Sequence, residues 1–325
     1  MTDDWTWHGG NLAAAKRRFG TGDRPWIDLS TGINPVPWPG TDRPIDWQRL
    51  PEADDLQALE SAAASCFGVD PRHVCAVPGT EIGLRLAGRL IGGAAHHIVP
   101  SYRTHGEMVE ASAPAGWDDL DDRGGTVILA NPNNPDGRVI EPAALHALLG
   151  RRADNGWLFV DEAFADFDPA LSLASSVTDD ARLLIFRSFG KFFGLAGVRL
   201  GFVLGPEALL AELRALLGAW PVSAAAVAIG AAAYADAGWI AAARRSLPER
   251  AAALDAVLAR AGYRATGCCP LFRLIDTNDA QGLFERLARH AILSRPFADQ
   301  PRWLRLGLPA SEAELARLAA ALADG

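Results

Sequence analysis

The sequence has little of what several classes of protein require. Its four cysteines show no spacing typical of a metal site, so no metal is expected. The longest apolar run, residues 224–233, is alanine-rich and too short to cross a bilayer. Residues 1–4 are acidic and lack an apolar core, so no secretion signal is expected. An excess of basic charge is also missing, since a net charge of −8 argues against nucleic-acid or anionic-membrane partners.

The remaining composition is ordinary for a soluble globular protein. Apolar residues make up 49% of the 325 residues and charged residues 22%, enough for one large or two modest domains with a sizeable core. The adjacent Cys268 and Cys269 do not readily close a disulfide on each other. A reduced, cytoplasmic setting is therefore expected.

Residues 187–199, Arg-Ser-Phe-Gly-Lys-Phe-Phe-Gly-Leu-Ala-Gly-Val-Arg, carry the strongest chemical signal. They follow an apolar run, Leu183–Phe186, that predicts a buried strand. A lone lysine such as Lys191 is usually a solvated loop residue. Here Ser188 and Arg199 flank it, and a hydroxyl with a guanidinium can hold a phosphate. A lysine nucleophile beside a phosphate site points to the aldehyde of pyridoxal 5'-phosphate (PLP), although spacing alone leaves both interpretations open.

Two upstream segments favour the PLP interpretation. Residues 157–161 predict a strand ending at Asp161, and ligands bind at the carboxyl edge of open α/β sheets. An aspartate paired with the pyridine nitrogen of PLP keeps that nitrogen protonated, although Asp161 alone is as consistent with a helix cap. A further predicted strand, Thr126–Ala130, runs into the Asn-rich turn of residues 131–137.

In this order of strands, turn and Ser-x-x-Lys, nearly the whole chain resembles the aspartate-aminotransferase-like PLP enzymes of fold type I. The resemblance implies an α/β fold, with a large domain built on a mostly parallel sheet and a small α+β C-terminal domain. It implies that Lys191 and Asp161 are catalytic and that PLP is the cofactor. The residues that the resemblance assigns to PLP are Gly79, Thr80, Tyr102, Asn134, Asp161, Ser188, Lys191 and Arg199.

The resemblance also gives individual roles to three of these positions. Gly79 and Thr80 open a predicted helix and would cradle the cofactor phosphate, although many helices begin this way without a ligand. Tyr102 would stack on the PLP ring, where the ordinary alternative is a half-buried loop tyrosine. Asn134 would hydrogen-bond the phenolic oxygen of the cofactor.

The first forty residues are expected to form an irregular arm rich in Gly, Pro and Trp. His8-Gly9-Gly10-Asn11 offers an imidazole and backbone N–H groups to an anion, although such a stretch is commonly a surface turn. Together with residues 28–35, Asp-Leu-Ser-Thr-Gly-Ile-Asn-Pro, it resembles the arm of the threonine-phosphate decarboxylases of cobalamin biosynthesis. Histidinol-phosphate aminotransferases, their near relatives, generally lack the His-Gly-Gly-Asn start.

This second resemblance implies a reaction and a substrate site. The reaction is PLP-dependent decarboxylation of O-phospho-L-threonine to (R)-1-amino-2-propanol O-2-phosphate. Two arginines, Arg305 and Arg295, match the pair that in this family binds substrate carboxylate and phosphate, although single strand arginines are usually solvated ion-pair partners. The substrate-binding residues implied by the resemblance are His8, Gly9, Gly32, Asn134, Arg295 and Arg305.

Three positions depart from the family pattern. Phe164 replaces a tyrosine that in many relatives donates to the cofactor, so Asn134 is expected to do more of that work. Gly190 stands where relatives often have a phosphate-binding hydroxyl. Gly32 stands where some decarboxylases carry an asparagine toward the substrate, which leaves only a backbone contact there.

Residues 1–45 are expected to form the arm, 46–217 the large PLP-binding domain and 218–325 the small domain. Fold-type-I enzymes usually work as homodimers, so a homodimer is expected. Two alternatives remain beside the decarboxylase. One is an aminotransferase of the histidinol-phosphate type, which needs a keto acid as second substrate. The other is a non-catalytic PLP-fold module, which the presence of Lys191, Asp161 and Arg199 disfavours.

Overall fold

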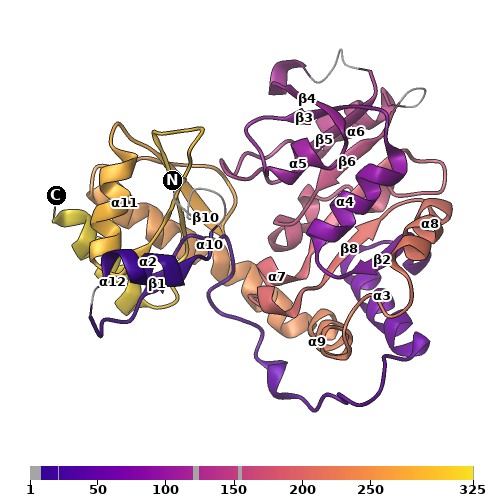
Figure 1. The fold of residues 1–325 in the computed structure, drawn as a ribbon, viewed down its shortest axis with the longest axis horizontal. Coiled ribbons are helices and arrows are strands. Elements are labelled where there is room, and N and C mark those ends of the chain that lie inside the picture. Colours follow the sequence, from indigo (N-terminus) through magenta and orange to yellow (C-terminus); the bar gives the residue numbers. More distant parts are fainter. Residues whose placement is uncertain (1–8, 21, 120–123, 153–155, 325) are drawn as a thin grey trace. The chain divides into compact units, whose positions relative to one another are not determined.

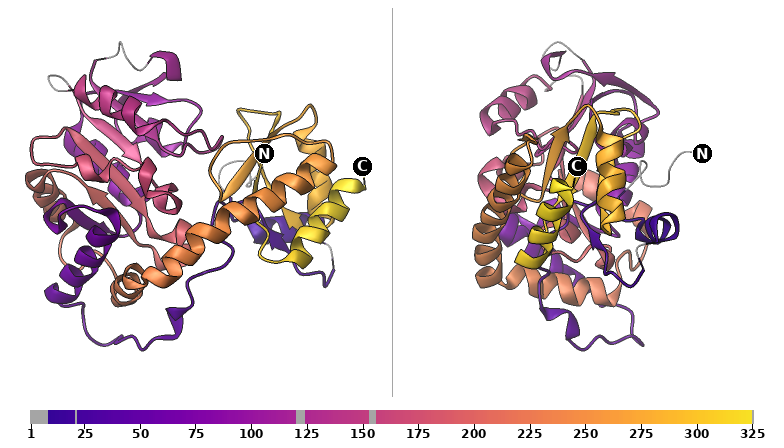
Figure 2. Two further views of the ribbon diagram at one scale, coloured as in Figure 1. Left: turned by 180° about the vertical axis from the view of Figure 1, so that it is seen from behind. Right: turned by 90° about the vertical axis from the view of Figure 1, so that its left-hand side faces the viewer.

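The helices and strands of the computed structural model form two units (Figures 1 and 2). The structure describes residues 9–20, 22–119, 124–152 and 156–324. The large unit contains residues 37–134 and 138–244, and the small unit contains residues 1–36, 135–137 and 245–325.

A seven-stranded sheet forms the centre of the large unit (Figure 1). Five of its strands, β2, β5, β6, β7 and β8, are mainly apolar and almost entirely buried, as expected where helices cover both faces of a sheet, whereas β3 and β4 are only partly buried. Only β8 runs antiparallel to its neighbours β2 and β7, and the other pairs are parallel, as the sequence predicts for this fold. In spatial order the strands are β2 (Val74–Val77), β8 (Gly201–Leu204), β7 (Leu183–Ser188), β6 (Leu158–Asp161), β5 (Thr126–Ala130), β3 (Ala94–Ile98) and β4 (Ala111–Ala115).

Helices and single turns connect these strands. The α-helices of the large unit are α3 (Ala53–Phe67), α4 (Thr80–Ile91), α5 (Thr104–Glu107), α6 (Pro142–Gly150), α7 (Phe189–Phe192), α8 (Glu207–Leu217) and α9 (Ala224–Ala235). Its 3-10 turns are η1 (Gly40–Asp42), η2 (Pro71–His73), η3 (Trp117–Asp119), η4 (Ala165–Phe167), η5 (Pro169–Leu171), η6 (Ala174–Ser176) and η7 (Ala196–Val198).

An aromatic cluster fixes the short helix α7, which carries Lys191. The rings of Phe189 and Phe193 stack at 4.7 Å, and Tyr234 from α9 meets the edge of Phe193 at 4.9 Å. Phe193 also stacks on Trp239 at 5.4 Å. A helix of four residues is not stable alone, so this packing holds α7 in place.

The small unit holds a four-stranded antiparallel sheet and a two-stranded parallel pair (Figure 2). The sheet consists of β12 (Arg295–Pro296), β13 (Trp303–Gly307), β10 (Phe272–Asp276) and β9 (Ala265–Thr266), and the pair of β1 (Ile27–Asp28) and β11 (Ile292–Leu293). The helices of this unit are α2 (Leu12–Phe19), α11 (Ala280–Arg289), α12 (Glu312–Ala323) and the later part of α10 (Ala237–Arg260).

The prediction of an irregular arm was wrong for Leu12–Phe19, which form α2. Asn11 caps this helix, since its side-chain oxygen accepts a hydrogen bond from Ala14 N at 3.3 Å. Phe19 meets the edge of Phe284 in α11 at 6.0 Å. This long-range contact stabilises a short segment whose sequence alone does not favour a helix strongly.

The helix α10 contains a proline, Pro248, and still continues from Ala237 to Arg260. Leu247 and Leu254, on either side of the proline, are fully buried. Residues 37–45 and 218–244 lie in the large unit, partly because α9 packs on α3. The expected bounds at 45 and 217 thus differ from the unit junctions, and the domain bounds stay a prediction.

Among the described residues, no single helix has the length and apolar character to cross a membrane. The helices α9 and α10, bent by 76° at the break between them, meet those two criteria only as a pair.

We expect Leu59→Ala to destabilise the large unit. Leu59 is fully buried in α3. A Cβ added at Gly230 of α9 would lie 2.8 Å from Leu59 Cδ1, which shows how closely the two helices pack. Truncation leaves a cavity there and lowers the free energy of unfolding by about 2–5 kcal/mol. Thermal unfolding followed by circular dichroism tests this. The control is Gln57→Ala on the exposed face of α3, and equal midpoints for the two variants would refute the packing argument.

Candidate active site

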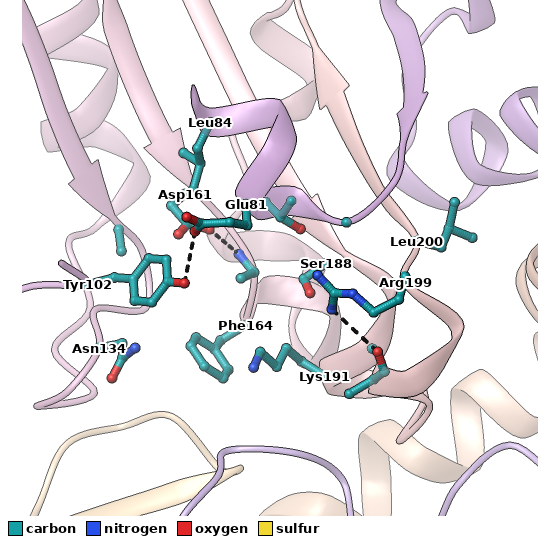
Figure 3. A pocket seen from close by; sticks show the side chains of 16 residues that line it. Glu81, Leu84, Tyr102, Asn134, Asp161, Phe164, Ser188, Lys191, Arg199 and Leu200 are labelled. Carbon is teal, nitrogen blue, oxygen red and sulfur yellow. Dashed lines mark hydrogen bonds between the residues drawn. The ribbon is translucent and has the colours of Figure 1, made fainter. Parts of the chain in front are cut away.

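A cavity of about 150 Å³ opens in the large unit at the carboxyl ends of β5, β6 and β7 (Figure 3). Carboxyl edges of parallel strands are the usual ligand sites of α/β sheets. All the residues that the sequence analysis assigned to PLP line this cavity: Gly79, Thr80, Tyr102, Asn134, Asp161, Ser188, Lys191 and Arg199. Their placement agrees with the assignment, and their roles stay predictions.

One side of the cavity is suited to an anion. Gly79 caps α4 with a positive φ of 89°, a backbone conformation that favours glycine. A Cβ at Gly79 would lie 2.6 Å from Arg199 Nη2, so the start of the helix and the guanidinium are close together. Ser188, at the end of β7, lies near Arg199 in Figure 3. A helix N-terminus, a hydroxyl and a guanidinium together form a phosphate site.

The carboxylate of Asp161 lies in another part of the cavity wall. Asp161 ends β6, and only 7% of it is exposed. One of its oxygens lies 3.0 Å from Nε2 of the fully buried His105, and the other accepts a hydrogen bond from Ala163 N at 3.0 Å. These two contacts fix the Asp161 carboxylate in a buried, low-dielectric part of the cavity wall.

Lys191 lies in α7, with its side chain directed into the cavity in Figure 3. Its ammonium is 5.8 Å from the centre of the Phe164 ring. Phe164, which replaces the expected tyrosine, is 95% buried, so it gives the lysine an apolar neighbour and no hydrogen-bond donor. A lysine amine directed into such a cavity can act as a nucleophile toward an aldehyde.

The Asn-rich turn holds Asn134 in the wall. The buried side chain of Asn131 accepts a hydrogen bond from Ile140 N at 2.9 Å and donates one to Ile140 O at 3.0 Å. Asn133 Nδ2 donates to Pro100 O at 2.9 Å, which ties the turn to the segment before Tyr102. These bonds replace the regular ladder that ends with β5 at Ala130.

Buried charges lie directly behind the cavity. Arg187, 2% exposed, donates to Glu162 Oε2 at 2.8 Å and forms a second ion pair with Asp166. Its carbonyl accepts a hydrogen bond from Thr80 Oγ1 at 3.0 Å. Burial raises the pKa of Glu162, and the Arg187 charge opposes this effect. This cluster supports the ends of β6 and β7, where Asp161 and Ser188 are located.

The sequence analysis did not assign roles to His105, Glu81 or Arg187. His105 follows Tyr102 by three residues, a spacing that brings both side chains to one side of a helical turn. Glu81 directly follows the Gly79–Thr80 turn. These spacings could have indicated His105 and Glu81 as site residues, whereas nothing in the sequence marks Arg187 as an ion-pair partner.

The residues assigned to substrate, apart from Asn134, lie in the small unit or outside the described residues. His8 is outside them. A Cβ at Gly9 would lie 2.3 Å from Ser30 O, so the glycine allows the two segments to meet. Gly10 N donates to Ser30 Oγ at 2.7 Å, and buried Gly32 follows in the same segment.

The two arginines of the small unit lie on neighbouring strands. Arg295 in β12 and Arg305 in β13 are register partners. Arg305 is 3% exposed and donates to Ser30 O at 2.9 Å. Burial and the neighbouring Arg295 charge lower the pKa of Arg305. An anion bound beside them would relieve this repulsion.

These observations fit PLP in the large unit. The cavity offers an anion site at the α4 N-terminus, an amine at Lys191 and a buried carboxylate at Asp161. The glycine at position 79 leaves the space that the guanidinium of Arg199 needs. The donor set therefore matches a phosphate, an aldehyde and a basic ring nitrogen.

Comparisons with known proteins agree with this fit. Residues 110–322 match the model of the aminotransferase class I and II family. A threonine-phosphate decarboxylase from Sinorhizobium sp. is 42% identical, with 97% of each chain covered. A histidinol-phosphate aminotransferase from Cronobacter sakazakii is 28% identical over 82% of this chain and 77% of its own.

The fold also matches solved structures. The histidinol-phosphate aminotransferase from Sinorhizobium meliloti, in complex with pyridoxal-5'-phosphate, superposes with a TM-score of 0.81 at 22% identity. The superposition covers 96% of this chain and 93% of that one.

We expect Arg187→Ala to destabilise the large unit strongly. The substitution leaves Glu162 and Asp166 buried without their cation, and removal of one partner from a buried ion pair costs about 3–5 kcal/mol. Urea unfolding of the purified variant tests this. The control is Arg182→Ala, which changes an exposed arginine just before β7. A midpoint for Arg187→Ala that equals the control would contradict a supporting role for the cluster.

Proposed function

The chain belongs to the aminotransferase class I and II family, and we propose that it is a PLP-dependent decarboxylase of O-phospho-L-threonine. The product is (R)-1-amino-2-propanol O-2-phosphate, a building block of cobalamin biosynthesis. The observation that carries the proposal is the hydrogen-bonded arm of the small unit, in which Gly10, Ser30 and Arg305 meet. The threonine-phosphate decarboxylase that is 42% identical supports the same reaction.

In this proposal the cavity residues hold the cofactor. The α4 N-terminus, Ser188 and Arg199 would bind its phosphate, and Lys191 Nζ its aldehyde carbon. Tyr102 would lie against the ring, and Asn134 would donate to its phenolic oxygen. When bound, PLP supplies an aldehyde for the substrate amine and a protonated ring that accepts the electron pair left after loss of CO2.

The remaining chemistry belongs to the side chains. Asp161, held by His105, would keep a proton at the ring nitrogen. Lys191 Nζ would return a proton to the substrate Cα after CO2 leaves. Phe164 beside Lys191 excludes water from one side of that amine.

Arg305 and Arg295 would bind the two anionic groups of the substrate. A carboxylate and a phosphate match two neighbouring guanidinium groups, and bidentate binding fixes the orientation of each anion. Orientation decides which bond at Cα breaks, so these arginines and the arm with His8, Gly9 and Gly32 would favour loss of CO2. The contacts of each residue with substrate are part of the proposal.

We also propose that the protein is a cytoplasmic homodimer. Free cysteines at all four positions are consistent with a reducing compartment. Six large apolar side chains among the described residues of the large unit are exposed: Trp47, Leu50, Ile82, Val99, Leu216 and Trp220. Of these, Trp220 and Leu50 line two neighbouring cavities of about 250 Å³ each, which share Pro51, Glu52 and Val227. Exposed apolar side chains beside such cavities are suited to a second copy of the chain.

We expect sustained CO2 release from O-phospho-L-threonine with PLP and without a keto acid. Mass spectrometry of the product should show aminopropanol phosphate, and Lys191→Ala should lower turnover by about 10³-fold or more, because it removes the amine and the candidate acid. Full activity of Lys191→Ala would rule out its role. If no CO2 is released and histidinol phosphate instead converts the cofactor to its amine form, the protein is an aminotransferase.

We expect Trp220→Asp to convert a dimer into monomers. Light scattering should give twice the chain mass of 34.5 kDa for the unchanged protein and the chain mass for the variant. A charge in an apolar interface is strongly unfavourable. Gln281→Asp, an exposed change on α11 of the small unit, is the control. A monomeric unchanged protein, or a dimeric Trp220→Asp variant, would refute this interface.

A further inference from the structure

Glu81 accepts more hydrogen bonds than any surface role requires. Its Oε2 accepts from Tyr102 Oη at 2.9 Å and from Thr104 Oγ1 at 2.8 Å. Its Oε1 accepts from Thr104 Oγ1 at 3.0 Å and from Arg85 Nε at 2.7 Å. The same side chain lines the cavity of Figure 3, where a dashed line joins it to Tyr102.

An acid in the first turn of a helix ordinarily needs no such partners. Its charge already interacts favourably with the N-terminus of α4. The i,i+4 pair with Arg85 is also ordinary for a helix, and Arg85 has Glu107 as a second partner at 2.8 Å. Tyr102 and Thr104, however, lie 21 and 23 residues further along the chain, so their contacts with Glu81 join two separate walls of the cavity.

The second of these walls also carries the partner of Asp161. Thr104 begins α5, and His105 is the next residue of that helix. His105 Nε2 lies 3.0 Å from Asp161 Oδ2, and its ring meets the edge of the Tyr102 ring at 5.8 Å. A carboxylate that fixes Tyr102 and Thr104 therefore also fixes the residue that holds Asp161.

Charge strengthens this arrangement. Burial opposes ionisation of Glu81, but the bonds from Thr104, Arg85 and Tyr102 outweigh it and lower the pKa of Glu81. Burial and the Glu81 charge raise the pKa of Tyr102 to about 12, with a smaller contribution from Asp161. The phenol thus stays neutral and keeps donating to Glu81, which leaves it unsuited to proton transfer.

We propose that Glu81 is a positioning residue that fixes the Tyr102 ring and the Thr104–His105 turn against Asp161. Through these contacts the Glu81 carboxylate aligns the Tyr102 ring and, through His105, Asp161. Both are thereby aligned with the predicted phosphate-binding turn, Gly79–Thr80, which directly precedes Glu81. The benefit for catalysis rests on the proposed function, but the contacts do not.

The test uses the whole protein without cofactor, labelled with ¹³C at the tyrosine ring carbon that bears oxygen. The chain has three tyrosines, Tyr102, Tyr234 and Tyr263, and Tyr102→Phe identifies the first signal. In the unchanged protein the Tyr102 signal should stay constant up to about pH 10.5. In Glu81→Gln, which keeps the shape and loses the charge, it should begin to move at least about 1 pH unit lower.

Glu107→Gln is the matched control, because Glu107, like Glu81, is an ion-pair partner of Arg85. It should leave the Tyr102 signal unchanged. A Tyr102 signal that titrates near pH 10 in the unchanged protein would overturn the proposal. So would the same titration curve in Glu81→Gln and in the unchanged protein.

A second readout measures the alignment itself. Glu81→Ala should weaken binding of PLP by about tenfold, because two hydrogen bonds that position the wall are lost, whereas Glu107→Gln should not. With saturating PLP, Glu81→Gln should lower kcat and leave KM for O-phospho-L-threonine nearly unchanged. Unchanged PLP affinity in folded Glu81→Ala would overturn the positioning role. A protein that binds PLP but releases no CO2 would refute the proposed reaction. The titration of the Tyr102 signal would then still decide whether Glu81 is a positioning residue.

Discussion

The site depends on a buried ion pair that ties two strand ends together. Arg187 lies in β7 directly before Ser188, the last residue of that strand, and Glu162 follows directly after Asp161. The pair between them therefore fixes the relative position of the Ser188 hydroxyl and the Asp161 carboxylate in the cavity wall. Two buried charges are costly unless they are paired, so the strand ends cannot separate without a large penalty. Phe67 lies 4.5 Å from the Arg187 guanidinium and adds an aromatic face to this support.

Aromatic packing and hydrogen bonding support different parts of the cavity. Stacked rings hold α7, so Lys191 is placed by apolar packing. Hydrogen bonds hold Tyr102, His105 and Asp161, so that part of the wall is placed by directional contacts. Ring packing fixes the backbone that carries the lysine, whereas hydrogen bonds fix the orientation of the polar side chains.

Much of the centre of the large unit could be predicted from the sequence, because β5, β6 and β7 are continuous apolar runs that end in polar turns. The strand at residues 126–130 was predicted with the bounds that β5 has, and the strand ending at Asp161 to within one residue. The residues that line the cavity came from the resemblance to the fold-type-I PLP enzymes, which these strand ends carry. Missed features depend on contacts distant in sequence: α2 needs Phe284, Arg187 needs Glu162 and Asp166, and Glu81 needs Thr104. Such partners leave no periodic pattern.

In the proposed function, the choice of reaction belongs to a different part of the chain from the cofactor chemistry. The cavity of the large unit can serve decarboxylation or transamination, because both need the same phosphate site, amine and carboxylate. In the small unit, Ser30 accepts from Arg305 through its carbonyl and from Gly10 through its hydroxyl, and that hydroxyl donates to Asp28. The arm and the buried arginine are thus one hydrogen-bonded assembly. A change in the arm would alter how the guanidinium is held and, under the proposed function, the orientation of a carboxylate bound to it.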